Sequence, residues 1–299
     1  MSQRALVTGA TGFVGRHLVA ELQSAGWQVV RAVRAEPDRT PPGTLGLGCD
    51  PWTTATFAGA LEQARPDVVF HMAGLTWADA PAAFYAANVM LAAHLLDAVA
   101  ASDTRPAVVL AGSAAEYGYV PNSLLPVRED APCNPVTHNG ISKYAQTLLG
   151  LAHARAGLRV LVARIFNPVG TGMPQRLALA SFARQLRDGC DSLTVGNLDV
   201  ARDFIDVAEA ARLIVALAGR PESDGQVINI CSGVAFVLRP LVETMIRLTR
   251  RDVRLDVAPA LLRPGEMRAF LGSTARLSAA GLTVQPPDFS RILPALLAG

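Results

Sequence analysis

The chain has 299 residues and a formal net charge of +2; 51% of its residues are apolar and 17% are charged. Such a chain can bury a full hydrophobic core, as one large domain or two smaller ones. The arginines are scattered along the sequence, which therefore offers no basic surface for nucleic acid or for a membrane. We expect any anionic partner to be a small molecule.

The cysteines indicate the compartment. They stand far apart without the spacing of a metal site, at Cys49, Cys133, Cys190 and Cys231. This pattern favours a reducing compartment over a disulfide framework. We identify no signal-peptide pattern and no apolar run that we expect to be long enough to cross a bilayer. The sequence thus predicts a cytoplasmic protein without a bound metal.

A strand, a glycine-rich turn and a helix open the sequence. Residues 4–8 are apolar and β-rich, and residues 17–25 have helical spacing. Glycines between a strand and a helix let the backbone turn tightly and approach a pyrophosphate, to which the helix offers free N–H groups. This context predicts a dinucleotide site formed by Gly9, Thr11, Gly12, Phe13, Val14 and Gly15.

The end of the second strand, expected at residues 28–33, indicates which dinucleotide binds. Enzymes that prefer NAD usually have an acid at this point, whereas this chain has Val33 followed by Arg34. An arginine favours the 2′-phosphate of NADP, so we expect NADP (NADPH) as cofactor, with NAD as the alternative. A solvated loop arginine is the other interpretation of Arg34. A loop expected over residues 37–48 leads to Asp50, a candidate contact to the adenine side.

Two further strands and a long helix follow. The strand expected at residues 68–74 ends in small side chains where a cofactor must pass, which makes Met72 and Ala73 candidate contacts. The helix expected at residues 80–100 is apolar on more than one face. Such a helix must be covered, so it predicts a homodimer contact. The strand at residues 107–112 ends at Ser113.

Lys143 is the only lysine among 27 basic residues. A lysine is a compact ammonium whose pKa can be lowered, whereas arginine effectively never releases its proton. Asn139 precedes it by four residues and shares its helix face, which we expect to point toward Ser113. Ser113, Asn139 and Lys143 are therefore the candidate catalytic residues; a drifted codon is the alternative explanation of the lone lysine.

Taken together, these motifs resemble an extended short-chain dehydrogenase/reductase of the nucleotide-sugar branch, over essentially the full length of the chain. The similarity lies in residues 8–15, 113–118, 164–170, 195–204 and 263–266, and in Lys143. Within this family the chain is most similar to GDP-6-deoxy-4-ketohexose reductases, such as GDP-4-keto-6-deoxymannose reductases. It shares with them the runs at residues 195–198 and 229–233.

The resemblance implies a Rossmann-type, doubly wound parallel sheet with a smaller C-terminal α/β lobe that closes over the substrate. It implies that Ile165 and Lys143 contact the cofactor. It also implies a nucleotide-diphosphate sugar as substrate, bound by Asn88, Asn167, Arg202, Arg263 and Glu266. For Arg202 and Arg263, surface ion pairs are the alternative.

One position departs from the family. In this family a serine or threonine, a tyrosine and a lysine act together. The tyrosine exchanges a proton with the sugar oxygen while hydride is transferred at the carbon that bears this oxygen. Here Asn139 stands at the tyrosine position. An amide can polarise a ketone but cannot deliver a proton at neutral pH. The proton donor stays unassigned, with five candidates: His138, Tyr144, Tyr117, Glu116, or a water held by Ser113 and Asn139.

The reaction is narrowed by residues 114 and 115. Dehydratases of the family carry an acidic pair after the active-site serine or threonine, whereas this chain has Ala114 and Ala115. The leading hypothesis is NADPH-dependent reduction of the 4-keto group of a nucleotide-activated 6-deoxyhexose. A nucleotide-sugar 4-epimerase is one alternative, and an NAD(P)- and nucleotide-binding protein with lost or altered chemistry is the other.

Two interleaved lobes are expected, because no flexible linker divides the chain. We assign residues 1–165 and 203–230 to the NAD(P)-binding domain, and residues 166–202 and 231–299 to the substrate lobe. In this half we expect strands at residues 159–163 and 227–230. We expect helices at residues 177–187, 206–218, 241–249 and 273–280.

Overall fold

The buried, β-rich runs form one seven-stranded parallel sheet in the order β10-β6-β5-β4-β1-β2-β3. The computed structural model describes residues 2–34, 44–262 and 265–299. Strand order runs outward in both directions from the β1–β4 pair, which is the doubly wound arrangement predicted from the sequence. The strands are β1 (Arg4–Thr8), β2 (Gln28–Val33), β3 (Thr44–Gly48), β4 (Val68–His71), β5 (Ala107–Ser113), β6 (Val160–Ile165) and β10 (Val227–Ile230).

Helices cover both faces of this sheet. Neighbouring side chains of β1 point to opposite faces, so Val7 joins the core beneath α1 and α7, whereas Leu6 joins the core beneath α2 and α4. Because both faces are buried, the strands are mostly apolar along their length instead of alternating between apolar and polar residues. The helices are α1 (Phe13–Ser24) and α7 (Val207–Leu217) on one face, and α2 (Thr54–Ala64), α4 (Leu91–Ala101) and α5 (His138–Arg155) on the other.

The expected long helix begins with α3 (Pro81–Phe84), continues through a π-helical turn (Tyr85–Met90) and ends with α4. Its 21 residues, Pro81–Ala101, are long and apolar enough to cross a membrane by length and composition, which corrects the expectation that no run reaches that length. The segment packs against α2 and α5. A buried core helix passes the same test, so this single segment is weak evidence for a membrane span.

The expected loop over residues 37–48 is wrong at its end, because residues 44–48 form β3. Leu45 and Leu47 alternate with glycines, and their backbones pair with Val30 and Ala32 of β2. The glycine-rich composition concealed a period-two pattern that becomes a strand only beside β2. Residues 35–43 lie outside the described residues.

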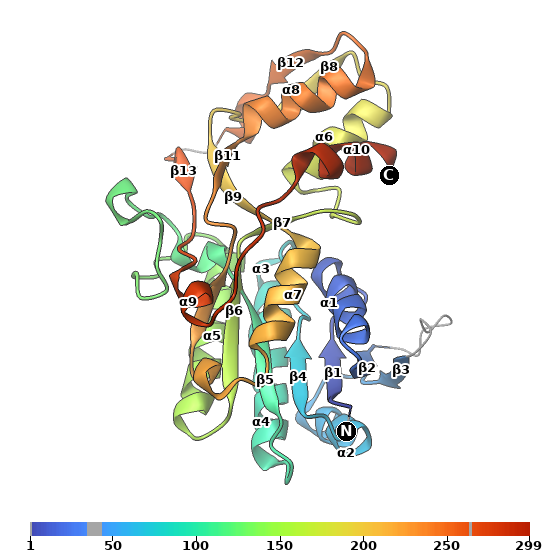
Figure 1. Ribbon diagram of the computed structural model, residues 1–299, viewed down its shortest axis with the longest axis vertical. Helices are drawn as coiled ribbons and strands as arrows, with labels where there is room; N and C mark the ends of the chain where they lie inside the picture. The colour runs from blue at the N-terminus through green and yellow to red at the C-terminus, as the bar shows by residue number, and fades with distance from the viewer. Residues whose placement is uncertain (1, 35–43, 263–264) are drawn as a thin grey trace.

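A smaller lobe stands above the carboxyl ends of the main strands (Figure 1). Its core is formed by apolar side chains such as Leu179, Val195 and Val242. One of its sheets contains β7 (Asn167–Val169), β9 (Ala201–Asp206), β11 (Ala235–Val237) and β13 (Ala269–Phe270), and the other contains β8 (Ser192–Val195) and β12 (Arg254–Val257). Its helices are α6 (Ala178–Arg187), α8 (Leu238–Thr249) and α10 (Phe289–Ala298).

The chain passes between the two parts more than once. After β9 it returns to the large domain with α7, which packs on α1, and with β10. It returns again with α9 (Ala275–Ala279), whose Leu277 lies in the main core. The expected lobe at residues 231–299 therefore includes a segment that packs on the main sheet, and the proposed domain boundaries stay a prediction.

Candidate active site

The glycine turn between β1 and α1 is too tightly packed for side chains. A Cβ atom at Gly9, whose φ is +65°, would lie 2.5 Å from the Ala73 nitrogen, and one at Gly15 would lie 2.0 Å from the Gly9 oxygen. Thr11 and Gly12 are exposed above this turn. Gly12 caps α1 without a side-chain hydrogen bond, which leaves the first N–H groups of the helix for a ligand. The turn therefore has the space and the free N–H groups that a pyrophosphate requires, and its binding residues stay a prediction.

Thr8 links this turn to the end of β4. Its Oγ1 accepts a hydrogen bond of 3.2 Å from the Ala73 nitrogen and lies 2.9 Å from His71 Nδ1. Burial, together with the charge of Lys143, lowers the pKa of His71 to about 3. His71 is thus a neutral core histidine near neutral pH. Met72 and Ala73 follow it half-buried, at the edge where the cofactor was expected to pass.

The ends of β2 and β3 present the two residues predicted for the adenosine half of the cofactor. Arg34 and Asp50 are both exposed at this edge. Arg34 makes no hydrogen bond or ion pair to another residue that the structure describes. Within β2, Arg31 is 3% exposed and its Nε and Nη2 atoms have no partner in the described part of the chain. This buried cation was not predictable as a candidate from the sequence, because nothing in the local pattern shows that Arg31 is buried.

The first turn of α5 carries Asn139 to the end of β5. The helix begins at His138, and the Thr137 side chain caps it by accepting a hydrogen bond of 3.1 Å from the Gly140 nitrogen. A Cβ atom at Gly140 would lie 2.4 Å from the Ala115 oxygen. The helix start therefore packs directly on the turn that follows Ser113, as the shared face with Lys143 predicted.

Lys143 is held in place beneath this turn. Its Nζ donates to the Ala111 oxygen at 2.8 Å and to Gln146 Oε1 at 3.0 Å, and the residue is 5% exposed. Burial lowers the pKa of Lys143 to about 8, against the opposing effect of the Glu116 charge. A Cβ atom at Gly74 would lie 2.9 Å from Nζ, so the backbone after β4 passes close to the ammonium.

Asn139 and Ser113 keep hydrogen-bonding capacity for a ligand. Oδ1 of Asn139 is buried and has no partner among the described residues. Ser113 Oγ accepts a hydrogen bond of 3.2 Å from the Ala115 nitrogen, which leaves its own O–H free to donate. A buried unpaired acceptor is costly, so Asn139 fits a site in which a bound molecule or water donates to it.

The structure removes three of the proposed proton donors. Tyr117 is fully buried and its O–H donates to Asn229 Oδ1 at 2.8 Å, while burial raises its pKa to about 12. Glu116 is also fully buried, and it pairs with Arg164 at 2.9 Å. His138 could reach the site only if α5 began after it, but the helix begins at His138 itself. Its Nδ1 lies instead 3.0 Å from the hydroxyl of Tyr85.

Asn88, expected to bind substrate, instead positions backbone. It is fully buried; its Oδ1 accepts from the Leu75 nitrogen at 2.7 Å, and its Nδ2 donates to the Leu75 oxygen and to Ser142 Oγ, both at 2.9 Å. All its hydrogen-bonding groups are therefore used inside the protein. The expectation that Asn88 binds substrate is therefore wrong. The sequence did not reveal this, because the partners of Asn88 are 13 and 54 residues away in the chain.

The other expected substrate contacts gather on the lobe. Arg202 Nη2 donates to Glu266 Oε1 at 2.9 Å, so the ion pair named as the alternative is formed. Asn167 Nδ2 donates to the Asp203 oxygen at 2.7 Å. Arg263 lies outside the described residues. Ile165, at the end of β6, is 8% exposed.

Asp203 connects the lobe to the main sheet, a role that the sequence analysis missed. Its buried carboxylate accepts hydrogen bonds from the Ser232 nitrogen and hydroxyl at 2.8 and 2.7 Å, and from the nitrogens of Gly233 and Gly272 at 3.0 Å each. Its position after Arg202 was visible in the sequence, but its donors come from two distant loops. Asp203 thereby holds β9, and with it Arg202, against the carboxyl end of β10.

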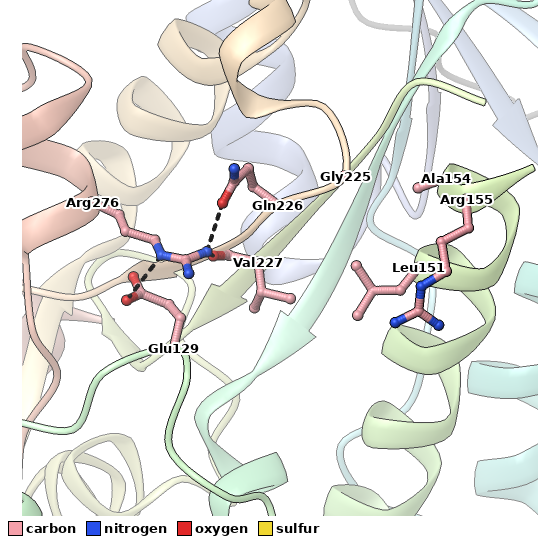
Figure 2. Close-up of a pocket in the computed structure, with 8 residues that line it drawn as sticks. All are labelled: Glu129, Leu151, Ala154, Arg155, Gly225, Gln226, Val227 and Arg276. Atoms are coloured by element: carbon pink, nitrogen blue, oxygen red, sulfur yellow. Dashed lines mark hydrogen bonds and ion pairs between the residues drawn. The ribbon is translucent and has the colours of Figure 1, made fainter. Parts of the chain in front are cut away.

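A cavity of about 390 Å³ lies away from the candidate active site, at the amino end of β10 and the last turn of α5 (Figure 2). On one side of it Glu129 accepts from the Asn229 nitrogen at 3.0 Å and lies 3.6 Å from Arg276, and these two side chains cover the free edge of β10. Ser113 and Lys143 are not among its lining residues. Among the described residues, no group of His, Cys, Asp or Glu side chains is arranged to hold a metal ion.

Known proteins match this chain over nearly its whole length. GDP-6-deoxy-D-mannose reductase from Pseudomonas aeruginosa is 34% identical over 289 residues, which cover 93% of this chain and 90% of that protein. The structure of RMD from P. aeruginosa complexed with NADPH is 31% identical, with a TM-score of 0.84 over 100% of this chain and 97% of that one. UDP-glucose 4-epimerase from Brucella ovis in complex with NAD is 25% identical, with a TM-score of 0.86 over 99% of this chain and 98% of that one.

The family assignment follows from the sequence match and from the site together. The model of the NAD dependent epimerase/dehydratase family matches residues 5–231. These residues contain the glycine turn, Ser113 and Lys143, and the seven strands of the parallel sheet end at the same edge. The chain therefore belongs to the NAD-dependent epimerase/dehydratase family, within the extended short-chain dehydrogenases/reductases that use NAD(P).

Proposed function

We propose that the protein reduces the 4-keto group of a nucleotide-activated 6-deoxyhexose with NADPH. The observation that carries the proposal is the grouping of Ser113, Asn139 and Lys143. A buried amide oxygen that has no partner among the described residues lies there one helical turn from the ammonium of the only lysine. The 34% identity to a GDP-6-deoxy-D-mannose reductase supports the substrate class. Arg34, which is exposed and has no partner in the part of the chain that the structure describes, supports NADPH over NADH.

The residues divide between binding and proton transfer. When bound, NADPH would supply the hydride that reduces the ketone carbon, while the ketone oxygen takes up a proton. The glycine turn and the start of α1 hold the pyrophosphate, and Arg34 holds the 2′-phosphate. Ser113 Oγ–H donates a hydrogen bond to the ketone oxygen, and the Asn139 Nδ2 group donates a second one that orients it.

Lys143 lies one helical turn from Asn139 and is a further proton source, beside the two candidates that remain, Tyr144 and a water held by Ser113 and Asn139. Two of its three N–H groups are used by Ala111 and Gln146, so one is left to donate. Because its pKa is lowered to about 8, the ammonium can release a proton near neutral pH, which asparagine cannot. We assign the proton to Lys143, directly or through one water, and solvent then recharges the amine.

The lobe is assigned to the nucleotide diphosphate. Arg202, Asn167, Glu266 and Arg263 are the proposed contacts, since arginine donates to phosphate in charge-assisted pairs. Arg202 is 19% exposed in its pair with Glu266, so its guanidinium is partly accessible from the lobe surface. Asn88 is left out of this set because its side chain is fully hydrogen-bonded inside the protein.

The test is the loss of NADPH absorbance with a GDP- or dTDP-linked 4-keto-6-deoxyhexose as acceptor. We expect turnover by the parent protein and faster turnover by Asn139→Tyr, because a positioned tyrosine is a better acid, worth about 10²–10⁴-fold in rate. Asn139→Ala is the matched variant without an amide. A parent that binds NADPH without turnover, beside an active Asn139→Tyr variant, would replace the proposal by a binding protein with lapsed chemistry.

A 4-epimerase is the second candidate, favoured by the TM-score of 0.86 to a UDP-glucose 4-epimerase. It makes a different prediction, since epimerisation interconverts two sugars without net consumption of the cofactor. Product analysis of UDP-, GDP- and dTDP-hexoses after incubation with NAD distinguishes it from the reductase. Epimerised sugar together with an inert 4-ketosugar would decide for this candidate.

We also propose a homodimer in the cytoplasm. Large apolar side chains stay exposed on the π-helical turn and on α5: Met90 is 52% exposed, Ile141 39% and Leu148 49%. A second copy of this face would cover them. A monomeric mass in solution would exclude the dimer, and recovery of the protein with membranes would exclude the location.

A further inference from the structure

Glu116 is a buried carboxylate beside Ser113 that accepts four hydrogen bonds. It is fully buried in the short 3₁₀ helix that follows Ser113. Its Oε1 accepts from the Ser113 nitrogen at 2.7 Å. Its Oε2 accepts from Thr147 Oγ1 at 2.9 Å and from Nε and Nη2 of Arg164 at 3.1 and 2.9 Å. A buried charge is stable only when paired in this way.

These contacts join the three elements that surround the candidate site. Ser113 ends β5, Arg164 lies in β6, and Thr147 lies on α5 one turn after Lys143. Arg164 is itself 2% exposed and stacks on the Tyr117 ring at 4.4 Å. Glu116 and Arg164 are both buried, so the Glu116 carboxylate is held in place. It therefore ties Ser113 to α5, the helix that carries Asn139 and Lys143.

The charge of Glu116 also reaches Lys143. Three charged or titratable groups surround the ammonium: His71 from β4, Glu116 from the 3₁₀ helix and, behind Glu116, Arg164 from β6. His71 stays neutral near neutral pH, because its pKa is lowered to about 3. Glu116 is therefore the negative charge that opposes the effect of burial on Lys143.

We propose that Glu116 is a positioning residue of the candidate site, which fixes Ser113 relative to α5 and places its negative charge against that helix one turn from Lys143. The role in turnover rests on the proposed reduction, in which Lys143 supplies the proton. The hydrogen bond to the Ser113 backbone and the electrostatic effect of Glu116 on Lys143 are both measurable whether or not the protein turns over a sugar.

The test uses the fact that the chain has a single lysine. Protein labelled with ¹⁵N-lysine shows one ammonium signal, Lys143, whose pH midpoint can be followed by NMR. We expect a midpoint near 8 in the parent, and one lower by roughly one pH unit in Glu116→Gln, because an opposite charge is removed. If turnover occurs, its high-pH limit moves down by the same amount.

Glu129→Gln is the matched control. Glu129 is likewise a buried carboxylate, with 4% exposure, which holds a backbone nitrogen and an arginine. It is not among the charges that act on Lys143. We expect the lysine midpoint to stay at the parent value in this variant. A midpoint that is the same in the parent and in both variants, or that falls equally in both, overturns the proposal.

A second variant covers the case in which Glu116→Gln fails to fold because Arg164 is left unpaired. Glu116→Asp keeps the charge but is one methylene too short to reach all its donors. We expect the Ser113 amide to exchange its hydrogen faster in this variant while the lysine midpoint stays near 8. Exchange at the parent rate would overturn the link between Glu116 and Ser113. An inactive parent with these shifts would refute the reductase and leave the role of Glu116 intact.

Discussion

Replacing Lys143 by methionine measures what it costs the fold to bury the only ammonium in the chain. Methionine is of similar length, and Gln146 Nε2 still donates to the Ala111 oxygen at 3.2 Å in its place. The pKa of Lys143 falls from 10.5 to about 8 on folding. At ~1.4 kcal/mol per pKa unit, this drop corresponds to about 3 kcal/mol of destabilisation while the lysine is charged in both states.

The pH dependence follows from the lowered pKa. Between about 8 and 10.5 the unfolded chain binds more protons than the folded one, so the stability of the parent rises with pH in this window. Below pH 8 the cost is fully present. Lys143→Met should therefore be more stable than the parent at pH 7, and this advantage should shrink by about 2–3 kcal/mol at pH 10.

The assay is urea unfolding of both proteins at pH 7 and pH 10, followed by circular dichroism. Other groups that titrate in this range are common to both proteins and cancel in the difference. The same free-energy difference at both pH values would refute the reasoning, because it would mean that Lys143 titrates alike in the folded and unfolded chain. The variant should also lose turnover, since methionine has no proton to give.

Two further predictions concern the lobe connection and the choice of cofactor. Asp203→Asn should lower the free energy of unfolding, measured in urea, by about 2–5 kcal/mol. The reason is that an amide leaves two of the four donors to this carboxylate unpaired. Unchanged stability would exclude the role of Asp203 in joining the lobe to the main sheet. Arg34→Ala should weaken NADPH binding by about 10–100-fold in fluorescence titrations, with little effect on NADH, because a charged hydrogen bond to phosphate is lost. An equal loss for both cofactors would contradict the 2′-phosphate role.

Elements with a clear local pattern were predictable from the sequence. The strands expected at residues 28–33 and 227–230 have those bounds in the structure, because each is a short, largely apolar and β-branched run, as a parallel sheet buried on both faces requires. The glycine turn was also predictable, because its pattern is local. Its close approaches involve Gly9 and Gly15 within one short segment, where only glycine fits.

The side chains around Ser113 were less predictable, because their partners are distant in the chain. Glu116 is a candidate proton donor by sequence, but its carboxylate accepts hydrogen bonds from Thr147 and Arg164, which are 31 and 48 residues away. Asn88 was assigned to substrate, but Ser142, 54 residues away, takes its amide. A single sequence does not reveal which buried polar groups satisfy one another, so both assignments depended on the packed structure.

The sequence by itself therefore determined the parallel α/β fold and the glycine turn, and it singled out the lone lysine as a candidate. These features depend on patterns within a few residues and on side-chain chemistry, which neighbours along the chain already specify. Only the tertiary structure decided that Glu116 pairs with Arg164, that Tyr117 is buried away from the site, and that Asp203 joins the lobe to the sheet. Burial and hydrogen-bond partners are properties of distant segments brought together, and they exist only once the chain has folded.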